Sequence, residues 1–258
     1  MTARGALGGR RAIVTGASRG IGRACARAIA RVGAVVALVA RGAEGLGETA
    51  RAIADEGGTA HVVSADLARW DEAAGVVARA GEALGGAPEI VVLSHGHMTP
   101  PGKVHALEPT AIAAALDTDL RSSLAILHAA APEMMGARWG RIVLVGSAIG
   151  RMGQPKSPLN SAIKAALEGL MRNVAQDFGR YGVTANLVAA GFVDNERQLE
   201  RTPDEATRAR MAKAAAIGRM VTPDEVAAAV TFLCSPAASG VNGAVLPVDG
   251  GLHLANVL

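Results

Sequence analysis

Short hydrophobic runs recur along the whole chain, and each is followed by a stretch in which apolar residues repeat at helical spacing. The runs are almost continuously apolar rather than alternating, which is typical of strands covered on both faces of a parallel sheet. We predict seven strands, at Ala12–Thr15, Val35–Ala40, His61–Ser64, Ile90–Ser94, Arg141–Gly146, Val183–Ala189 and Ala244–Val248. The intervening stretches predict helices at Ile21–Val32, Ala43–Glu56, Trp70–Leu84, Pro109–Arg138, Leu159–Gly179 and Pro223–Cys234.

The regular alternation of strands and helices predicts an α/β fold. We expect a single Rossmann-type, doubly wound parallel sheet of about seven strands with helices on both faces. No linker or repeat interrupts the series, so we predict one domain over residues 1–258. The polar, Arg- and Glu-rich segment 195–219 fits the alternation poorly. Because insertions at the carboxyl ends of such strands usually border the ligand, we favour a lid over a simple surface excursion.

Composition narrows the class of protein. Half of the residues are hydrophobic and 19% are charged, which indicates a globular chain rather than a disordered one. The net charge is only +3 and the basic residues are scattered, so no nucleic-acid-binding surface is expected. Cys25 and Cys234 are isolated, which argues against a disulfide framework and fits a reducing, cytoplasmic setting.

Neither the beginning of the chain nor its longest uncharged stretch predicts a membrane segment. Residues Met1–Arg11 lack the apolar core of a signal peptide. The stretch Val226–Val248 is interrupted by Ser-Pro, Gly and Asn-Gly, whereas a spanning helix needs about 20 continuous apolar residues. We therefore expect a protein that does not associate with membranes.

The clearest chemical signal is the turn between the first strand and the first helix, Thr15-Gly16-Ala17-Ser18-Arg19-Gly20-Ile21-Gly22. Dinucleotide-binding turns need glycine for a tight bend, for close approach of the backbone to a pyrophosphate, and for helix–strand packing. Gly16, Gly20 and Gly22 supply these positions, and the helix that follows offers free N–H groups to an anion. The motif stands in the required strand–turn–helix context, so we predict a dinucleotide site.

Two arginines favour NADP(H) over NAD(H). The second strand ends in Val39-Ala40-Arg41-Gly42, with no carboxylate to accept a hydrogen bond from a ribose 2′-hydroxyl. Arg19 adds a second guanidinium within the glycine turn, and guanidinium groups suit a 2′-phosphate. Asp66, after the third strand, is placed to accept from the adenine amino group, although capping of the next helix is an alternative.

The chain resembles the short-chain dehydrogenase/reductase family, and in particular its members that resemble 3-oxoacyl-acyl-carrier-protein reductases. The resemblance runs from the Thr15–Gly22 turn through Asp66, Ser147 and Lys164 to Val248-Asp249-Gly250-Gly251. It implies a catalytic tetrad of Asn, Ser, Tyr and Lys, in which Tyr donates the proton. It further implies that the cofactor is lined by Gly16, Ser18, Arg19, Gly20, Ile21, Gly22, Arg41, Asp66, Leu67, His95, Gly96, Lys164, Gly191 and Val193.

Only half of that tetrad is present. The family's Ser and Lys match Ser147 and Lys164, whereas Asn160 stands where the family has Tyr and Asp119 where it has Asn. Asn160 and Lys164 are one helical turn apart, as Tyr and Lys would be, and the only tyrosine, Tyr181, lies a helix later. The family's Asn-Asn-Ala-Gly motif becomes Leu93-Ser94-His95-Gly96, and its Pro-Gly becomes Ala190-Gly191.

The substitution at position 160 changes what the site can do. A carboxamide donates a hydrogen bond but does not release a proton, so Asn160 would polarise a carbonyl without completing the transfer. His95 or His97 is a candidate replacement acid, with bonding to the loop backbone as the alternative. Asp119 would pair with Lys164 or act as a base, or else hold a surface or buried water. A metal site at His95 and His97 is not favoured, because no further ligand lies near them in the sequence.

The sequence is compatible with three functions. The first is an NADP(H)-dependent interconversion of a ketone and an alcohol; the second is a non-catalytic, cofactor-binding subunit that supports an intact relative; the third is non-redox chemistry on the same fold. The resemblance implies a homo-oligomer, a dimer or tetramer, while a mixed oligomer fits the second function. We expect a small-molecule substrate of ketone or acyl thioester type. Apolar candidates for its pocket are Met98, Trp139, Met152 and Phe192.

Overall fold

The computed structural model describes residues 5–97 and 99–254, and they contain a single seven-stranded parallel sheet. The predicted fold class is confirmed. The strands are β1 Arg11–Thr15, β2 Val35–Ala40, β3 Thr59–Ser64, β4 Ile90–Leu93, β5 Gly140–Ser147, β6 Val183–Ala190 and β7 Val245–Val248. Their order across the sheet is β3-β2-β1-β4-β5-β6-β7. Strands β1 to β3 proceed from the middle of the sheet to one edge and β4 to β7 proceed to the other edge, so the strand order reverses between β1 and β4.

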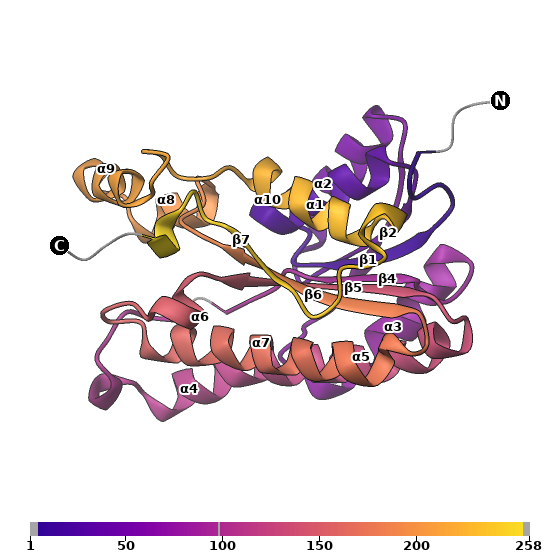
Figure 1. Cartoon of the computed structure of the whole chain (residues 1–258), viewed down its shortest axis with the longest axis horizontal. Helices are drawn as coiled ribbons and strands as arrows, with labels where there is room; N and C mark the ends of the chain where they lie inside the picture. The colour runs from indigo at the N-terminus through magenta and orange to yellow at the C-terminus, as the bar shows by residue number, and fades with distance from the viewer. Residues whose placement is uncertain (1–4, 98, 255–258) are drawn as a thin grey trace.

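Helices cover both faces of this sheet, as the two helical layers of Figure 1 show. The longer helices are α1 Gly20–Arg31, α2 Ala43–Asp55, α3 Trp70–Leu84, α5 Ser122–Gly136, α7 Pro158–Gly179 and α10 Pro223–Cys234. The shorter ones are α4 Pro109–Ala115, α6 Ile149–Met152, α8 Glu196–Arg201 and α9 Glu205–Ala214. Single 3₁₀ turns occupy Val104–Ala106, Pro236–Ala238 and Leu252–Leu254.

The core is aliphatic and divides along the sheet. One cluster joins α1, α2 and α10 to one face, through residues such as Ile29, Leu46 and Val230. A second cluster joins α3, α5 and α7 to the other face, through residues such as Val76 and Met171. The continuous apolar runs of the inner strands follow from this two-sided burial.

The strand β3 departs from the predicted pattern. It begins two residues earlier than expected and lies at the edge of the sheet, where its side chains are mostly exposed or half-buried. Val62, for example, is 43% exposed. An edge strand has a neighbour on one side only, so it is less covered than the central strands.

The predicted helix 109–138 is helical from Pro109 to Gly136, but it is not α-helical throughout. Between α4 and α5 the backbone forms a π-helical segment over Leu116–Arg121. Extra residues in a turn of this kind change which side chains point inward, and such turns are frequent at functional sites. Asp119 lies in this segment and is 3% exposed.

Candidate active site

Two adjoining cavities lie at the carboxyl ends of the strands, where the strand order reverses. This is the position at which open α/β sheets bind their ligands. The larger cavity, of about 370 Å³, runs from the glycine turn to Arg41 and Asp66. The smaller cavity, of about 150 Å³, contains Ser147, Asn160 and Lys164. Six residues line both: Ile21, Ser94, His95, His97, Asn195 and Arg197.

The three glycines of the turn have separate roles. Gly16 and Gly20 have φ angles of +67° and +56°, a region that favours glycine. A Cβ on Gly22 would lie 2.2 Å from the carbonyl oxygen of Gly16, so only glycine allows α1 to pack this closely on the turn. A Cβ on Gly20 would meet nothing closer than 3.5 Å, and its backbone borders the larger cavity.

The amino end of α1 is open to an anion. No side chain caps it, and its first turn contains no acidic residue. Its unpaired N–H groups and the positive end of its dipole border the cavity that the glycines line. This cradle fits a dinucleotide pyrophosphate.

Five residues that the resemblance places at the cofactor border the larger cavity: Ser18, Arg19, Arg41, Asp66 and Leu67. Arg19 Nη1 pairs with Glu200 Oε1 of α8 at 2.5 Å. Asp66 Oδ1 accepts from the N–H of Ala68 at 3.2 Å, and α3 has Arg69 as its N-cap. The helix-capping role considered for Asp66 is therefore wrong, because its carboxylate closes the turn before the helix.

The smaller cavity brings the predicted catalytic residues together. Ser147 ends β5, and Asn160 and Lys164 lie one turn apart near the start of α7. Lys164 Nζ is 3.7 Å from Asp119 Oδ2, and both side chains are nearly buried. Burial lowers the pKa of Lys164, Asp119 opposes that change, and Arg197 adds to it. A surface position for Asp119, one of the alternatives, is excluded.

The loop after β4 is built around Asp119. The N–H of His97 donates to Asp119 Oδ1. A Cβ on Gly96 would lie 3.2 Å from Asp119 Oδ2 and 3.7 Å from Lys164 Nζ, so glycine lets the loop approach the pair closely. His97, Gly96 and Asp119 thus form one contiguous wall beside Lys164.

His95 is held in a chain of hydrogen bonds. Its Nδ1 lies 2.6 Å from Thr15 Oγ1, and its Nε2 lies 2.7 Å from Ser122 Oγ, which donates to the carbonyl of Thr118. Both hydroxyl groups also donate to backbone carbonyls, Thr15 to Val92 and Ser122 to Thr118, so the ring is fixed between two side chains that are themselves held by the backbone. Burial lowers the pKa of His95 to about 4. A lowered pKa and the engagement of both ring nitrogens disfavour an acid role for His95 near pH 7.

Two further residues expected at the cofactor follow β6. Gly191 and Val193 line the smaller cavity. A Cβ on Gly191 would lie 2.7 Å from Asp249 Cα, so glycine is needed for the β6 end to pass the Val-Asp-Gly-Gly segment. Val193 is buried and pairs with Val221, which anchors the start of segment 195–219.

The helix α8 contributes residues that the sequence interpretation did not identify. Arg197 lines both cavities, and its Nη2 donates to the carbonyl of His97 at 2.7 Å. Arg201 lines the smaller cavity, while Glu200 faces Arg19. The signal was present as a pair of Glu-Arg dipeptides four residues apart, at 196–197 and 200–201, which puts like charges on one helix face.

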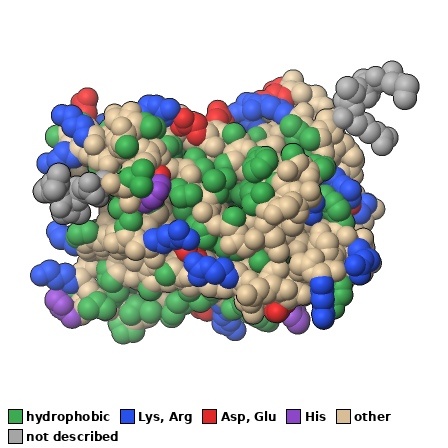
Figure 2. Space-filling model, viewed as in Figure 1, with side chains coloured by type: hydrophobic (Ala, Val, Ile, Leu, Met, Phe, Trp, Pro, Cys, Tyr) green, Lys and Arg blue, Asp and Glu red, His purple; other side chains and the backbone are tan. Residues whose placement is uncertain are grey.

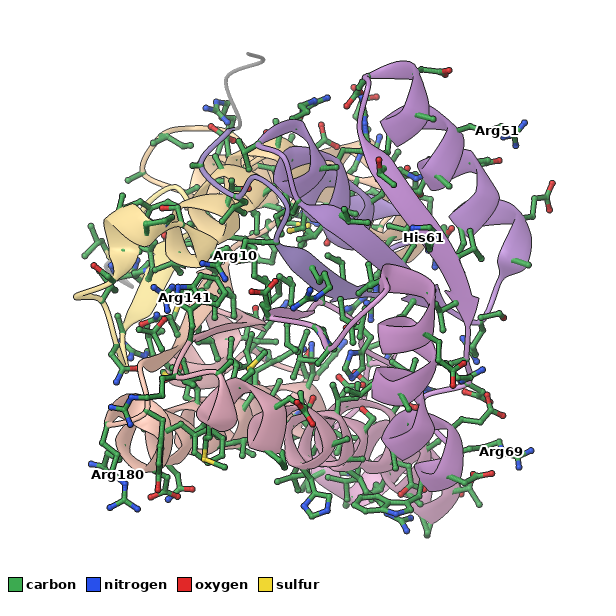
Figure 3. The ribbon with its side chains drawn as sticks, turned by 90° about the vertical axis from the view of Figure 1, so that its right-hand side faces the viewer. Arg10, Arg51, His61, Arg69, Arg141 and Arg180 are labelled. Carbon is green, nitrogen blue, oxygen red and sulfur yellow. The ribbon has the colours of Figure 1, made fainter. Side chains whose placement is uncertain are left out.

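The apolar pocket residues proposed from the sequence do not gather at the site. Trp139 precedes β5, at the opposite end of the strands, where the guanidinium carbons of Arg10 and Arg141 lie 3.8 and 4.6 Å from the centroid of its ring. Figure 3 shows these two arginines close together. Met152 and Phe192 line neither cavity, and Met98 lies outside the described residues.

Across residues 5–97 and 99–254, no group of three His, Cys, Asp or Glu side chains is arranged to hold a metal ion. Within the same ranges, no helix has both the length and the hydropathy needed to cross a bilayer.

Comparisons with known proteins agree with this geometry. A family profile described as enoyl-(acyl carrier protein) reductase matches residues 16–253. The chain is 36% identical over 252 residues to a 3-oxoacyl-[acyl-carrier-protein] reductase of Pseudomonas aeruginosa, covering 96% of this chain and 99% of that protein. It is 38% identical over 240 residues to a cis-4-hydroxycyclohexanecarboxylate dehydrogenase of Sinomonas cyclohexanicum, covering 93% and 95%.

Solved structures give the same result. A 3-oxoacyl (acyl-carrier-protein) reductase of Agrobacterium tumefaciens with NADP bound is similar with a TM-score of 0.89 and 32% identity, covering 95% of each chain. A protein described as a short chain dehydrogenase/reductase family protein is similar with a TM-score of 0.87 and 34% identity, covering 96% of this chain and 99% of the other. The chain therefore belongs to the short-chain dehydrogenase/reductase family.

Proposed function

We propose that this protein is an NADP(H)-dependent oxidoreductase that interconverts a ketone and an alcohol, at a site without the tyrosine hydroxyl of its family. The observation that supports this proposal is the close adjacency of the two cavities. The cavity that contains the glycine cradle adjoins a polar cavity that holds Ser147, Asn160 and Lys164, and six residues line both. NADP(H), when bound, supplies or accepts the hydride.

The residues that would hold NADP(H) are distributed along the larger cavity. The pyrophosphate would lie on the glycine turn and the amino end of α1. Arg19 and Arg41 would bind the 2′-phosphate, and Asp66 would receive the adenine amino group. Lys164 would hold the nicotinamide ribose hydroxyls. The NADP-bound reductase from Agrobacterium tumefaciens supports this choice of cofactor.

The chemistry at the carbonyl would rest on Ser147, Asn160 and a titratable neighbour. The Ser147 hydroxyl and the Asn160 amide would donate hydrogen bonds to the carbonyl oxygen and stabilise the charge that develops there. The proton would come from Lys164 or His97, which both line the smaller cavity. Burial lowers the pKa of Lys164, and this makes its ammonium a stronger acid.

The segment 195–219 would serve as a lid. Its first helix, α8, borders both cavities through Arg197, and its neighbour α9 lies beside it at the left of Figure 1. Movement of α8 would admit the cofactor and then cover it.

An oligomer would suit the outer surfaces of the helices. On α7 the small residues Ala162, Ala165, Ala166 and Gly169 are all exposed, and Leu124 of α5 is 44% exposed. A second such surface lies over α10, where Phe232 is 44% exposed and Figure 2 shows hydrophobic side chains gathered. We propose a homo-oligomer on this basis.

The test of the proposed function is the substitution Asn160→Tyr, with Asn160→Phe as its matched control. We expect the purified protein to bind NADPH and to oxidise it slowly with a ketone from a panel of β-keto thioesters, cyclic ketones and keto sugars. Restoring the phenol should raise kcat on the order of 10²–10⁴-fold, because general acid catalysis typically contributes that much. Phenylalanine fills the same space without a proton and should give no gain.

Three results would contradict this assignment. If the protein did not bind NADPH, the proposed cofactor would be wrong. An inert protein that becomes a reductase only as Asn160→Tyr would favour the cofactor-binding partner subunit. A lower rate in Asn160→Tyr than in the wild type would show that Asn160 belongs to a differently organised site.

A further inference from the structure

The short helix α8 presents two stripes of opposite charge. Its acidic residues face the glycine turn: Glu200 pairs with Arg19, and Glu196 Oε2 would lie 3.9 Å from a Cβ on Gly20. Its basic residues, Arg197 and Arg201, line the cavity with the catalytic residues. Residues four apart lie above one another on a helix, so each stripe is a direct result of the repeated Glu-Arg pair.

The two basic residues lie at different depths. Arg197 lines both cavities and donates to the carbonyl of His97, so it lies at the junction where the cofactor would pass. Arg201 lines only the smaller cavity, together with the amide of Gln198 and with Ser147 and Asn160. Arg201 therefore faces the substrate end.

The smaller cavity has more positive than negative charge. Its lining contains three cations, Lys164, Arg197 and Arg201, and one carboxylate, Asp119, which lies 3.7 Å from Lys164. Burial lowers the pKa of Arg197, and the charge of Arg197 lowers that of Lys164 further. Lys164 and Arg197 are partly withdrawn from solvent, whereas Arg201 is exposed, so an anionic ligand at Arg201 would also offset the positive charge of the two deeper cations.

The guanidinium of Arg201 is available for such a ligand. Within the described part of the chain, no ion pair or side-chain hydrogen bond engages it. A guanidinium binds a carboxylate through two parallel hydrogen bonds, and an adjacent amide can donate a third. The cavity measures about 150 Å³, which suits a small acid better than a long acyl chain.

We propose that the basic stripe of α8 binds a carboxylate of the substrate, with Arg201 as its principal contact, so that the preferred substrates are small oxo acids and hydroxy acids. This inference rests on the proposed function, because it places the substrate's carbonyl at Ser147 and Asn160. It assigns Arg201 to substrate specificity and not to the cofactor.

The test compares an oxo acid with its own ester, for instance 4-oxocyclohexanecarboxylate with its methyl ester. Hydrogen bonds to charged groups contribute enough for the wild type to prefer the acid by about 10- to 100-fold in kcat/KM. In Arg201→Gln this ratio should fall to near one, while the dissociation constant of NADPH stays the same. Arg201→Lys should retain part of the preference, because it keeps the charge but loses the bidentate geometry.

The matched control is Arg210→Gln. Arg210 is an exposed arginine of α9 that donates to Thr207 Oγ1 and lines neither cavity. The substitution Arg210→Gln removes the same charge from the same segment, and the ratio of kcat/KM for the acid to that for the ester should not change. A fall in the ratio equal to that of Arg201→Gln would mean that only the general charge of the segment matters, and would overturn the proposal.

A binding measurement separates this proposal from the proposed function. Calorimetry should detect cyclohexanecarboxylate, which has no carbonyl to reduce, binding to the NADP⁺ complex of the wild type but not to that of Arg201→Gln. If this acid binds through Arg201 but no ketone is reduced, the oxidoreductase assignment fails and the carboxylate site stands. If ketones are reduced with equal kcat/KM for acid and ester, the carboxylate site fails and the oxidoreductase stands.

Discussion

The ion pair between Arg19 and Glu200 predicts an effect on cofactor preference. Arg19 is one of the two arginines available for a 2′-phosphate, and in this structure its guanidinium is engaged by Glu200 of α8. Replacing Glu200 with Gln removes both the competitor for Arg19 and a negative charge close to the site of the phosphate. NADPH binding should tighten, whereas NADH, which has no 2′-phosphate, should bind as before.

The expected change in the dissociation constant of NADPH follows from the solvent exposure of the Arg19–Glu200 ion pair. The two side chains are 46% and 48% exposed, so solvent screens the pair strongly. Exposed ion pairs typically contribute about 0.2–1 kcal/mol, which corresponds to about 1.5- to 5-fold in the dissociation constant of NADPH. The difference should shrink as salt is raised, because the screening length falls.

The assay is titration of the fluorescence of NADPH and NADH at low and high salt. Glu205→Gln is the control, since Glu205 is an exposed glutamate in the first turn of α9 and lines neither cavity. The reasoning is refuted if Glu200→Gln weakens the binding of NADPH, if it tightens the binding of NADH by the same factor as that of NADPH, or if the control variant has the same effect.

Two more outcomes follow from the structure. Because burial lowers the pKa of His95 from 6.5 to about 4, the unfolded chain binds a proton in that window and the folded protein does not. The free energy of unfolding should therefore fall by up to about 3 kcal/mol between pH 7 and pH 4; urea denaturation should show this fall in the wild type, and an equal fall in His95→Gln would contradict it. The exposed apolar surfaces of α7 and α10 predict that light scattering will give a multiple of the 26.0 kDa chain mass, whereas a monomer would contradict a stable oligomer.

Much of the fold could be predicted from local patterns in the sequence. Strands and helices are encoded by the spacing of apolar residues, which neighbours in the chain determine. The positive φ angles of Gly16 and Gly20 and the close contact at Gly22 likewise follow from a turn of eight residues. The grouping of Ser147, Asn160 and Lys164 was predicted through the resemblance to a family and the rule that strand ends converge.

Other features depend on contacts between distant segments. Nothing in the helix-forming stretch 109–138 marks the π-helical segment that turns Asp119 toward Lys164. Trp139 was expected at the substrate, but the strand that follows it carries it to the opposite end of the sheet.

The sequence by itself determined the class of fold, the glycine turn that suits a dinucleotide, and the spacing of Asn160 and Lys164 on one helix, because each of these depends on residues close together in the chain. The tertiary structure decided the electrostatics of the site. Arg19 and Glu200 are 181 positions apart, and only the return of the chain after β6 brings α8 over both cavities. Charges so distant in sequence interact because folding brings them together, and a local sequence pattern does not determine which distant residues come into contact.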